Sequence, residues 1–327
     1  MILAGDIGGT KTNMGLFDLS GGALRSERQQ SFSSKSHTGL EDIVGKFMTG
    51  ETRAVTAACF GVAGPVIDGQ SVTPNLPWVV DSNSLARMLG LDSVTLLNDL
   101  ESTAYGLMEL KPEEIATLNS GTGASGNAAL IAAGTGLGVA SLFWDGDSFL
   151  PSASEGGHMD FAPRNETEVG LLQFLLAEHR HVSVERVLSG PGLYNIYRFL
   201  SSSGYGEETP EVEERMRHDD PSSVISNAAL EGESELCVKA LDMFAGIYGA
   251  VAGNVALMLK ATGGVFIGGG IAPKILEKLK DGTFMRAFLD KGRLTPLLEE
   301  IRVQVVLNDK TALLGAARVA ARSNRVK

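Results

Sequence analysis

Two stretches of the chain share one pattern, in which a short apolar strand runs into a glycine-rich turn and a second strand follows. The first copy spans residues 2–18 around Asp-Ile-Gly-Gly-Thr at 6–10. The second spans residues 128–144 around Gly-Thr-Gly-Leu-Gly at 134–138. Glycine permits backbone conformations that other residues disfavour, so both turns can present main-chain amides to an anion. We interpret the pair as a weak internal repeat that predicts two related halves.

Apolar runs suited to buried strands alternate with segments of helical spacing along the rest of the chain. Continuous runs of this kind are typical of strands buried on both faces of a sheet. The pattern predicts strands near 55–62, 94–97, 265–267 and 303–307, and helices near 40–48, 82–89, 100–110, 234–260 and 311–321. It indicates an α/β protein with hairpins at the start of each half. We expect the two halves to face each other across a cleft, and the polar stretch 201–221 to be an exposed excursion.

The charge of the chain limits which partners it can bind. The net charge is −11 over 327 residues, a length that predicts about two domains. An acidic surface repels nucleic acid and anionic membranes, so neither is an expected partner. It also repels a polyphosphate. Any bound nucleotide must therefore be held by backbone N–H groups and a divalent cation.

The two cysteines and the apolar segments indicate a compartment. Cys59 and Cys237 lie far apart in apolar segments, which favours buried free thiols over a zinc site. No segment has the pattern of a signal peptide, so we expect a cytoplasmic protein. The apolar stretch 244–271 is interrupted by Asn254 and Lys260, and we interpret it as a buried helix followed by a strand.

The two glycine turns are candidates for phosphate binding. Thr10 can donate its hydroxyl to a phosphate oxygen, and Asp6 can hold a hydrated Mg²⁺. The second turn lacks the Gly-Lys-Ser/Thr of a Walker loop and the spacing of a dinucleotide fingerprint. Taken alone, the first stretch fits a plain hairpin turn slightly better than a phosphate site, and the second stretch fits either interpretation equally well. The loop Gly121–Gly123 is set aside, because polar residues flank it.

Polar side chains follow a buried strand at Asn98 and Asp99. Ligands of open α/β sheets bind outside the carboxyl ends of strands. Asn98 can hydrogen-bond a sugar hydroxyl, and Asp99 can accept the proton of an attacking hydroxyl. An ordinary carboxylate is a weak base, which suffices where the transition state is loose and positioning dominates. The alternative is that Asp99 is only the N-cap of the following helix.

Two further motifs complete the candidate site. Glu155 and His158 flank two glycines and can hydrogen-bond a polyol, with Glu185 as another acceptor. A metal site or a structural turn stays open for this motif. The triplet Gly268–Gly270 joins a strand to a helix, where one glycine would suffice for a plain turn. Its flat backbone surface suits a purine.

These elements, in this order, resemble the non-ROK bacterial glucokinases of the sugar kinase/Hsp70/actin superfamily over almost the whole chain. The most specific parts are Glu155–Pro163 and Glu185–Gly192. The resemblance implies a two-domain actin-like ATPase (ribonuclease H-like) fold with a cleft between a small and a large domain. The small domain would take residues 1–109 plus 310–327. The large domain would take residues 110–309 and supply a homodimer contact.

The resemblance also implies an ATP-dependent phosphoryl transfer to the 6-hydroxyl of glucose, with Asp99 as the base and Mg²⁺ held by Asp6 through water. The implied glucose contacts are Asn98, Asp99, Glu155, His158 and Glu185. The nucleotide contacts are Gly5, Asp6, Ile7, Gly8, Gly9, Thr10, Gly134, Thr135, Gly136, Gly268, Gly269 and Gly270.

Three rival functions are weighed against this one. The first is a kinase of another hexose, with ADP or polyphosphate as an alternative donor. The second is a non-catalytic sugar-sensing regulator of the ROK type, which usually carries an N-terminal helix-turn-helix domain; here the phosphate motif starts by residue 5. The third is a phosphatase or acetate-kinase-like relative, against which the Glu-Gly-Gly-His motif argues. The zinc motif of ROK kinases is cysteine-rich and is not implied here.

Overall fold

A computed structural model describes residues 1–73 and 76–323, and the chain divides into two compact units. The first comprises residues 1–114, 150–153 and 308–327, and the second comprises residues 115–149 and 154–307. The resemblance implies boundaries at 109/110 and 309/310 and no separate segment at 150–153. The division into a small and a large domain at those boundaries stays a prediction.

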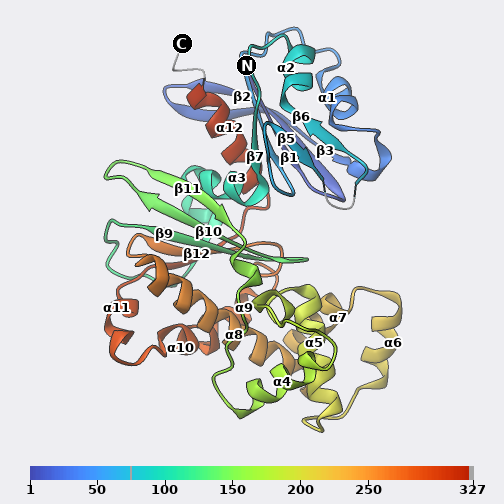
Figure 1. The fold of residues 1–327 in the computed structure, drawn as a ribbon, viewed down its shortest axis with the longest axis vertical. Helices are drawn as coiled ribbons and strands as arrows, with labels where there is room; N and C mark the ends of the chain where they lie inside the picture. The colour runs from blue at the N-terminus through green and yellow to red at the C-terminus, as the bar shows by residue number, and fades with distance from the viewer. Residues whose placement is uncertain (74–75, 324–327) are drawn as a thin grey trace. The chain divides into compact units, whose positions relative to one another are not determined.

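The first unit is built on a five-stranded sheet in the order β3-β2-β1-β4-β7, in which β1 is antiparallel to β2 and parallel to β4 (Figure 1). Its strands are β1 Ile2–Ile7, β2 Lys11–Ser20, β3 Ala23–Ser33, β4 Ala57–Val62 and β7 Thr95–Asn98, with a separate hairpin of β5 Gln70–Val72 and β6 Val79–Asp81. Its helices are α1 Leu40–Met48, α2 Ser82–Leu89, α3 Asp99–Gly106 and α12 Thr311–Ser323.

Helices cover both faces of this sheet. Along β1, Leu3 and Ile7 pack into a core with α1 and α2, whereas Ile2 and Ala4 pack against α12. Successive side chains of a strand point to opposite faces, so Asp6 follows Ile2 and Ala4 onto the α12 side. Burial on both faces explains why β1 and β4 read as continuous apolar runs.

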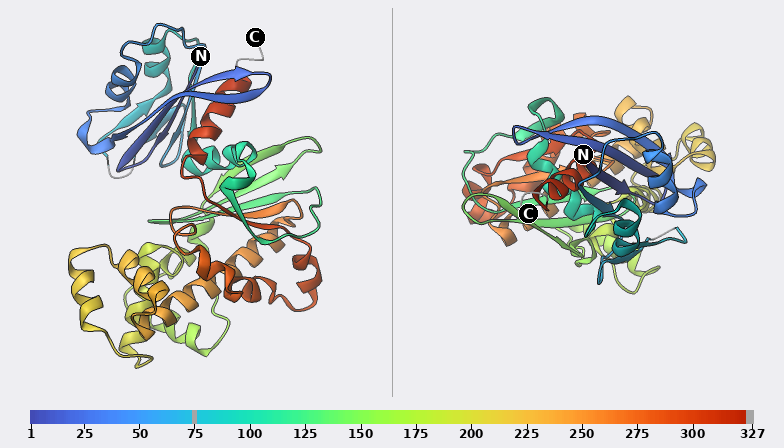
Figure 2. Two further views of the ribbon diagram at one scale, coloured as in Figure 1. Left: turned by 180° about the vertical axis from the view of Figure 1, so that it is seen from behind. Right: turned by 90° about the horizontal axis from the view of Figure 1, so that it is seen from above.

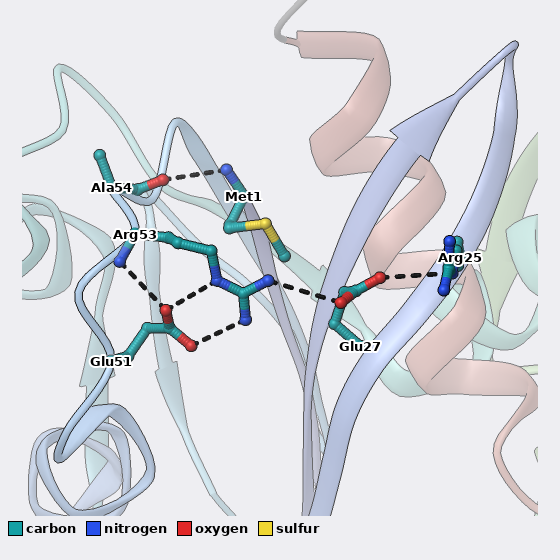
Figure 3. A network of polar contacts seen from close by, with 6 residues as sticks. All are labelled: Met1, Arg25, Glu27, Glu51, Arg53 and Ala54. Carbon is teal, nitrogen blue, oxygen red and sulfur yellow. Dashed lines mark hydrogen bonds and ion pairs between the residues drawn. The ribbon is translucent and has the colours of Figure 1, made fainter.

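The first strand is tied to the segment that precedes β4 (Figure 3). The amino group of Met1 donates to the carbonyl of Ala54 at 2.9 Å. Beside it, Arg53 bonds both carboxylate oxygens of Glu51 and reaches Glu27 on β3. The hydrogen bonds from Arg53 lower the pKa of Glu51 to about 2. Such exposed pairs contribute little stability, but they align the strands whose far ends carry the candidate site.

The second unit contains a six-stranded sheet in the order β11-β10-β9-β12-β13-β8, seen from both sides in Figures 1 and 2. The strands of this sheet are β8 Ile115–Asn119, β9 Ala128–Ala133, β10 Leu137–Trp144, β11 Phe149–Ser154, β12 Gly264–Gly268 and β13 Val303–Val306. Residues 150–153 of β11 are those grouped with the first unit. Its helices are α4 Glu166–Leu176, α5 Gly190–Ser202, α6 Pro210–His218, α7 Pro221–Glu231, α8 Glu235–Leu259, α9 Leu276–Lys280, α10 Thr283–Leu289 and α11 Thr295–Glu299.

Helix α8 is the central helix of this unit. It is long and apolar enough to cross a membrane by length and composition, but 78% of its most apolar window is buried inside the fold. Tyr248 on α8 is fully buried and donates its hydroxyl proton to Ile131 O on β9 at 3.1 Å. A strand, β12, follows α8. The sequence interpretation of residues 244–271 as a buried helix and then a strand is confirmed.

The structure also differs from the sequence interpretation. Strands β8 and β11 were not predicted, because their half-exposed residues lack a long apolar run. The stretch 201–221 is largely exposed, as expected, but it also contains helix α6, in which the side chain of Val212 is buried. Both glycine turns are also shorter than predicted, since the flanking strands extend to Ile7 on one side and to Leu137 on the other.

Candidate active site

The candidate residues of the first unit meet at one edge of its sheet. Ile7 pairs with Val62 on β4, and Val62 pairs with Asn98 on β7, so three parallel strands end side by side. The turn after β1 and the Asn98–Asp99 pair therefore share the carboxyl edge of the sheet, where ligands of such folds bind. Gly61 lies opposite Asp6 on the intervening strand, and a side chain there would collide with Ser102 of α3.

Asp6 is the most perturbed carboxylate of this edge. Its pKa is raised to about 6, mainly by burial and to a smaller extent by the nearby charges of Asp99 and Asp309. Asn13 opposes the shift by donating its Nδ2–H to Asp6 Oδ2 at 3.1 Å, and Ser31 Oγ donates to Asn13 Oδ1 at 2.7 Å. A divalent cation would relieve the repulsion among the three carboxylates. The surroundings of Asp6 therefore fit the predicted Mg²⁺.

Among the residues that the structure describes, no group of three or more His, Cys, Asp or Glu side chains is arranged to bind a metal ion. The protein alone therefore does not supply a full set of metal ligands there. Mg²⁺ characteristically takes one or two carboxylates and completes its shell with water and phosphate oxygens. The position of Asp6 beside Asp99 and Asp309 suits binding of Mg²⁺ by few carboxylates with water and phosphate oxygens as the other ligands. The metal-site alternative for Glu155 and His158 gains no support.

The first glycine turn consists of Gly8, Gly9 and Thr10. Gly5 and Ile7 are buried residues of β1. Packing against β4 requires glycine at position 5, because a Cβ there would lie 2.6 Å from Phe60 Cδ1. The assignment of a turn from Asp6 onward is corrected, because the β1–β2 ladder continues to the Ile7–Thr12 pair. Only Gly8, Gly9 and Thr10 of this motif therefore lie outside the strands β1 and β2.

Ser34 holds this turn in place, and sequence reasoning missed it. Its buried hydroxyl donates to Gly8 O at 2.7 Å, and its backbone N–H donates to Thr10 O at 2.9 Å. Ser34 follows β3, which pairs with β2 over its whole length. Its neighbours in the sequence, Ser33 and Lys35, form no motif that would have marked it as functional.

The Asn98–Asp99 pair forms the junction of β7 and α3. Asn98 is the N-cap: its Oδ1 accepts from Leu100 N at 3.0 Å, and its Nδ2 donates to Gly64 O at 3.1 Å. Asp99 is the first residue of α3, and its Oδ1 also accepts from Leu100 N, at 2.8 Å. The alternative in which Asp99 is the N-cap is wrong. Its carboxylate instead belongs to the first turn of α3, near the positive end of the helix dipole.

In the second unit the two other glycine motifs meet. Gly269 has a φ of 82°, and a side chain there would collide with the carbonyl of Ala133 at the end of β9. Gly134 follows at once and donates its N–H to Gly136 O at 2.8 Å. A Cβ on Gly134 or on Gly270 would meet no atom within 4 Å. Gly134 and Gly270 therefore face open space. Of the three glycines, only Gly269 has a backbone conformation and a close neighbour that require glycine.

The open space is a pocket of about 360 Å³. That volume is within the usual range for small-molecule sites. Its wall combines the two glycine motifs with the starts of α5 and α7, and its lining includes Gly134, Thr135, Gly190, Pro191, Asp220, Ser222, Ser223, Gly270 and Lys274. The α7 residues and Lys274 were missed by sequence reasoning. Asp220-Pro221 does have the form of an N-cap followed by a first-turn proline, but it closes the stretch that was read as an excursion.

The predicted sugar motifs lie on two short 3-10 turns, Gly156–His158 and Val184–Arg186. Backbone hydrogen bonds hold them together, from Val184 N to Met159 O at 2.8 Å and from Phe161 N to Val182 O at 3.0 Å. Glu155 and His158 are exposed, and Glu185 is half-buried. Gly157 leaves room for the carbonyl of Leu137, so this turn packs against the first residue of β10.

The structure thus brings the predicted residues together in two groups. Asp6, the Gly8–Thr10 turn, Asn98 and Asp99 share one sheet edge in the first unit. Glu155, His158, Glu185 and the glycine motifs at 134–136 and 268–270 gather in the second. The decoy loop Gly121–Gly123 packs instead against the backbone near Glu300 and Arg302.

Comparison with solved structures defines the class of this protein. The fold matches a crystal structure of glucokinase from an Antarctic psychrotroph with a TM-score of 0.87 and 31% sequence identity, covering 98% of each chain. It also matches a ROK family glucokinase from Streptomyces griseus, solved in complex with glucose and AMPPNP, with a TM-score of 0.65 and 21% identity. The chain has the actin-like ATPase fold of the sugar kinases, and its class is that of the ATP-dependent hexose kinases.

Within that class the sequence comparisons identify the family. The glucokinase family model matches residues 3–323. The glucokinase of Nostoc sp. (strain PCC 7120) is 40% identical over 98% of this chain and 99% of its own length, and that of Psychromonas ingrahamii is 38% identical over 96% of the chain. The chain belongs to the glucokinase family. The resemblance drawn from the five sequence motifs is confirmed.

Proposed function

We propose that this glucokinase-family protein transfers the γ-phosphoryl group of ATP to the 6-hydroxyl of glucose, giving glucose 6-phosphate and ADP. The observation that carries the proposal is the convergence around Gly134–Leu137. One side of this turn opens on the 360 Å³ pocket beside the glycine triplet. The other side contacts the Glu155–His158 turn through Gly157 and the Glu185 turn through Leu137. A nucleotide site and a polyol site there share one hairpin.

The proposed roles divide among residues of both units. Amides of the two glycine turns bind the phosphates, and the triplet 268–270 accepts the adenosine. Asn98, Glu155, His158 and Glu185 orient the sugar by hydrogen bonds. Asp99 accepts the proton of the 6-hydroxyl as it attacks in line, a task in which positioning matters more than basicity.

Asp6 is the residue proposed to hold Mg²⁺ through water. When bound, the ion neutralises charge on the phosphates, which the net charge of −11 cannot do. We further propose a cytoplasmic homodimer that binds neither nucleic acid nor membrane, as the family resemblance and the acidic composition indicate. Light scattering on the purified protein tests the dimer.

Substitution of Asp99 by Asn tests the base. We expect kcat to fall by about 10³-fold or more, because the amide cannot accept the proton, while glucose affinity is largely kept. Glu101→Gln, which removes a carboxylate two residues further along α3, is the matched control and should retain turnover. Near-normal kcat in Asp99→Asn would remove this residue from the base role.

The sugar and the donor are tested by a panel. Glucose, mannose, glucosamine and fructose are each assayed with ATP, ADP and polyphosphate, and kcat/KM is compared. We expect the highest value for glucose with ATP. A higher value for another hexose would assign the enzyme to that sugar. The absence of turnover with every pair would favour the regulator alternative.

A further inference from the structure

The carboxylate of Glu185 is bonded to the second phosphate turn. Leu137, the first residue after that turn, donates its backbone N–H to Glu185 Oε2 at 2.8 Å. At the other end of the turn, Gly190 N donates to Gly134 O at 2.8 Å. The segment 185–190 is therefore attached to both ends of the turn 134–137.

Gly136 leaves the room that this contact needs. A Cβ on Gly136 would lie 2.6 Å from Glu185 Oε2 and 3.5 Å from its Cδ, and no other atom lies within 4 Å. Gly136 does not have a positive φ, so its backbone does not require glycine. Space for the Glu185 carboxylate is thus the structural reason for glycine at this position.

The backbone of Glu185 is fixed as well. Ser189 Oγ donates to Glu185 O at 2.7 Å and accepts from Gly192 N at 3.0 Å, which ties Glu185 to the first turn of α5. The next residues of that helix, Gly190 and Pro191, line the pocket. A change in the position of the Glu185 carboxylate is therefore transmitted to the turn and not absorbed by a mobile main chain.

We propose that Glu185 is a positioning residue that couples sugar binding to nucleotide binding through the Leu137 N–H. The inference rests on the proposed function, in which a sugar hydroxyl donates to this same carboxylate. A sugar so bound restrains the carboxylate and, through it, the turn. The nucleotide phosphates then meet a turn that is already ordered, and they lose less entropy on binding.

Coupling of this kind is reciprocal: glucose tightens nucleotide binding by the same factor by which nucleotide tightens glucose binding. We expect a factor of about 5 or more, within the usual range for coupled sites. The probe nucleotide is AMPPNP with Mg²⁺, and calorimetry gives the Kd of glucose with and without it. The ratio of the two Kd values is the coupling factor.

Two alanine substitutions separate the Glu185 contact from other features of the same region. In Gly136→Ala the new methyl group displaces the Glu185 carboxylate, so the coupling factor should fall to about 1 and the glucose Kd should rise without nucleotide. In the control Arg186→Ala an exposed side chain next to Glu185 is removed, so the coupling factor should stay at the value of the unaltered protein. Retained coupling in Gly136→Ala overturns the inference.

Variants of Glu185 serve if Gly136→Ala does not fold. Glu185→Gln keeps an oxygen that can accept from Leu137 N–H and should retain coupling, whereas Glu185→Ala should lose it. Coupling that persists in Glu185→Ala overturns the inference, as does a coupling factor of 1 in an unaltered protein that phosphorylates glucose. Failure of the unaltered protein to phosphorylate any hexose instead overturns the proposed function.

Discussion

Asp6 shows how one half-buried carboxylate can serve function at a cost in stability. Its folded-state pKa of about 6, against 3.8 for an ordinary aspartate, means that the fold favours the protonated form. Ionisation above that pKa opposes folding, because the carboxylate is buried near Asp99 and Asp309. A residue with no binding role would not be expected to retain this charge.

Replacing Asp6 by Asn should therefore stabilise the fold while removing the proposed Mg²⁺ contact. A pKa change from 3.8 to about 6 corresponds to at most about 3 kcal/mol. Urea unfolding without nucleotide or Mg²⁺ should show this gain at pH 7.5. The gain should shrink as the pH falls through 6 and vanish below about 3.8, where both folded and unfolded Asp6 are protonated. A gain that does not change with pH contradicts this account.

Secondary-structure elements were the part most readable from sequence. The helix bounds 40–48 and 82–89 were predicted as the structure has them. Local patterns suffice there, because an amphipathic stripe and a capping side chain act within one or two turns. In the structure Asp81 caps α2 by accepting from Ser84 N, and Asn165 caps α4 by accepting from Glu168 N.

The contact of α8 with α10 depends on glycines of α8. Gly246, Gly249 and Gly253 lie three and four residues apart along this helix. In the structure a side chain at Gly249 would collide with the carbonyl of Phe284, and one at Gly253 would lie 2.6 Å from that of Phe288. Gly246 instead has only the Arg164 side chain nearby, at 3.4 Å.

Gly249→Ala should lower the free energy of unfolding by about 1–3 kcal/mol, because the added methyl group forces α10 away. Gly246→Ala is the matched control. The guanidinium near it can move, and alanine is the better helix former, so this variant should be neutral or slightly more stable. Chemical denaturation followed by circular dichroism distinguishes the two. If both substitutions changed the free energy of unfolding equally, the close contact of α10 with Gly249 would not be the reason for glycine at this position.

At the scale of the whole molecule, the end of the chain completes the first unit. Helix α12 buries Leu313, Ala316 and Ala320 against the sheet formed by residues 1–98. Arg318 reaches Glu109 through two hydrogen bonds of 2.6 Å. Gly315 lets the helix meet the carbonyl of Ser102 on α3, because a side chain there would collide with it.

A chain ended before residue 308 should lose the first unit as a folded body. The face of β1 and β4 that carries Ile2, Ala4 and Cys59 would be exposed to water, and its hydrophobic stabilisation would be lost. We expect weaker amide protection in residues 1–114 by hydrogen exchange. Arg322→Ala, in the exposed last turn of α12, should leave that protection unchanged. Full protection after truncation would show that the sheet is stable without α12.

The sequence by itself determined the class, the strand–turn–strand repeat, the order of the motifs and the family, because these follow from local patterns. The tertiary structure decided where each motif ends and what holds it. Only strand register places Asn98 at the same sheet edge as the end of β1, with β4 between them, and only packing makes Ser34 the support of the first turn. Only the fold brings the start of α7 and Lys274 into the pocket, and Glu185 against Leu137. Contacts between residues distant along the chain leave no periodic trace in it, which is why they could not be read from the sequence.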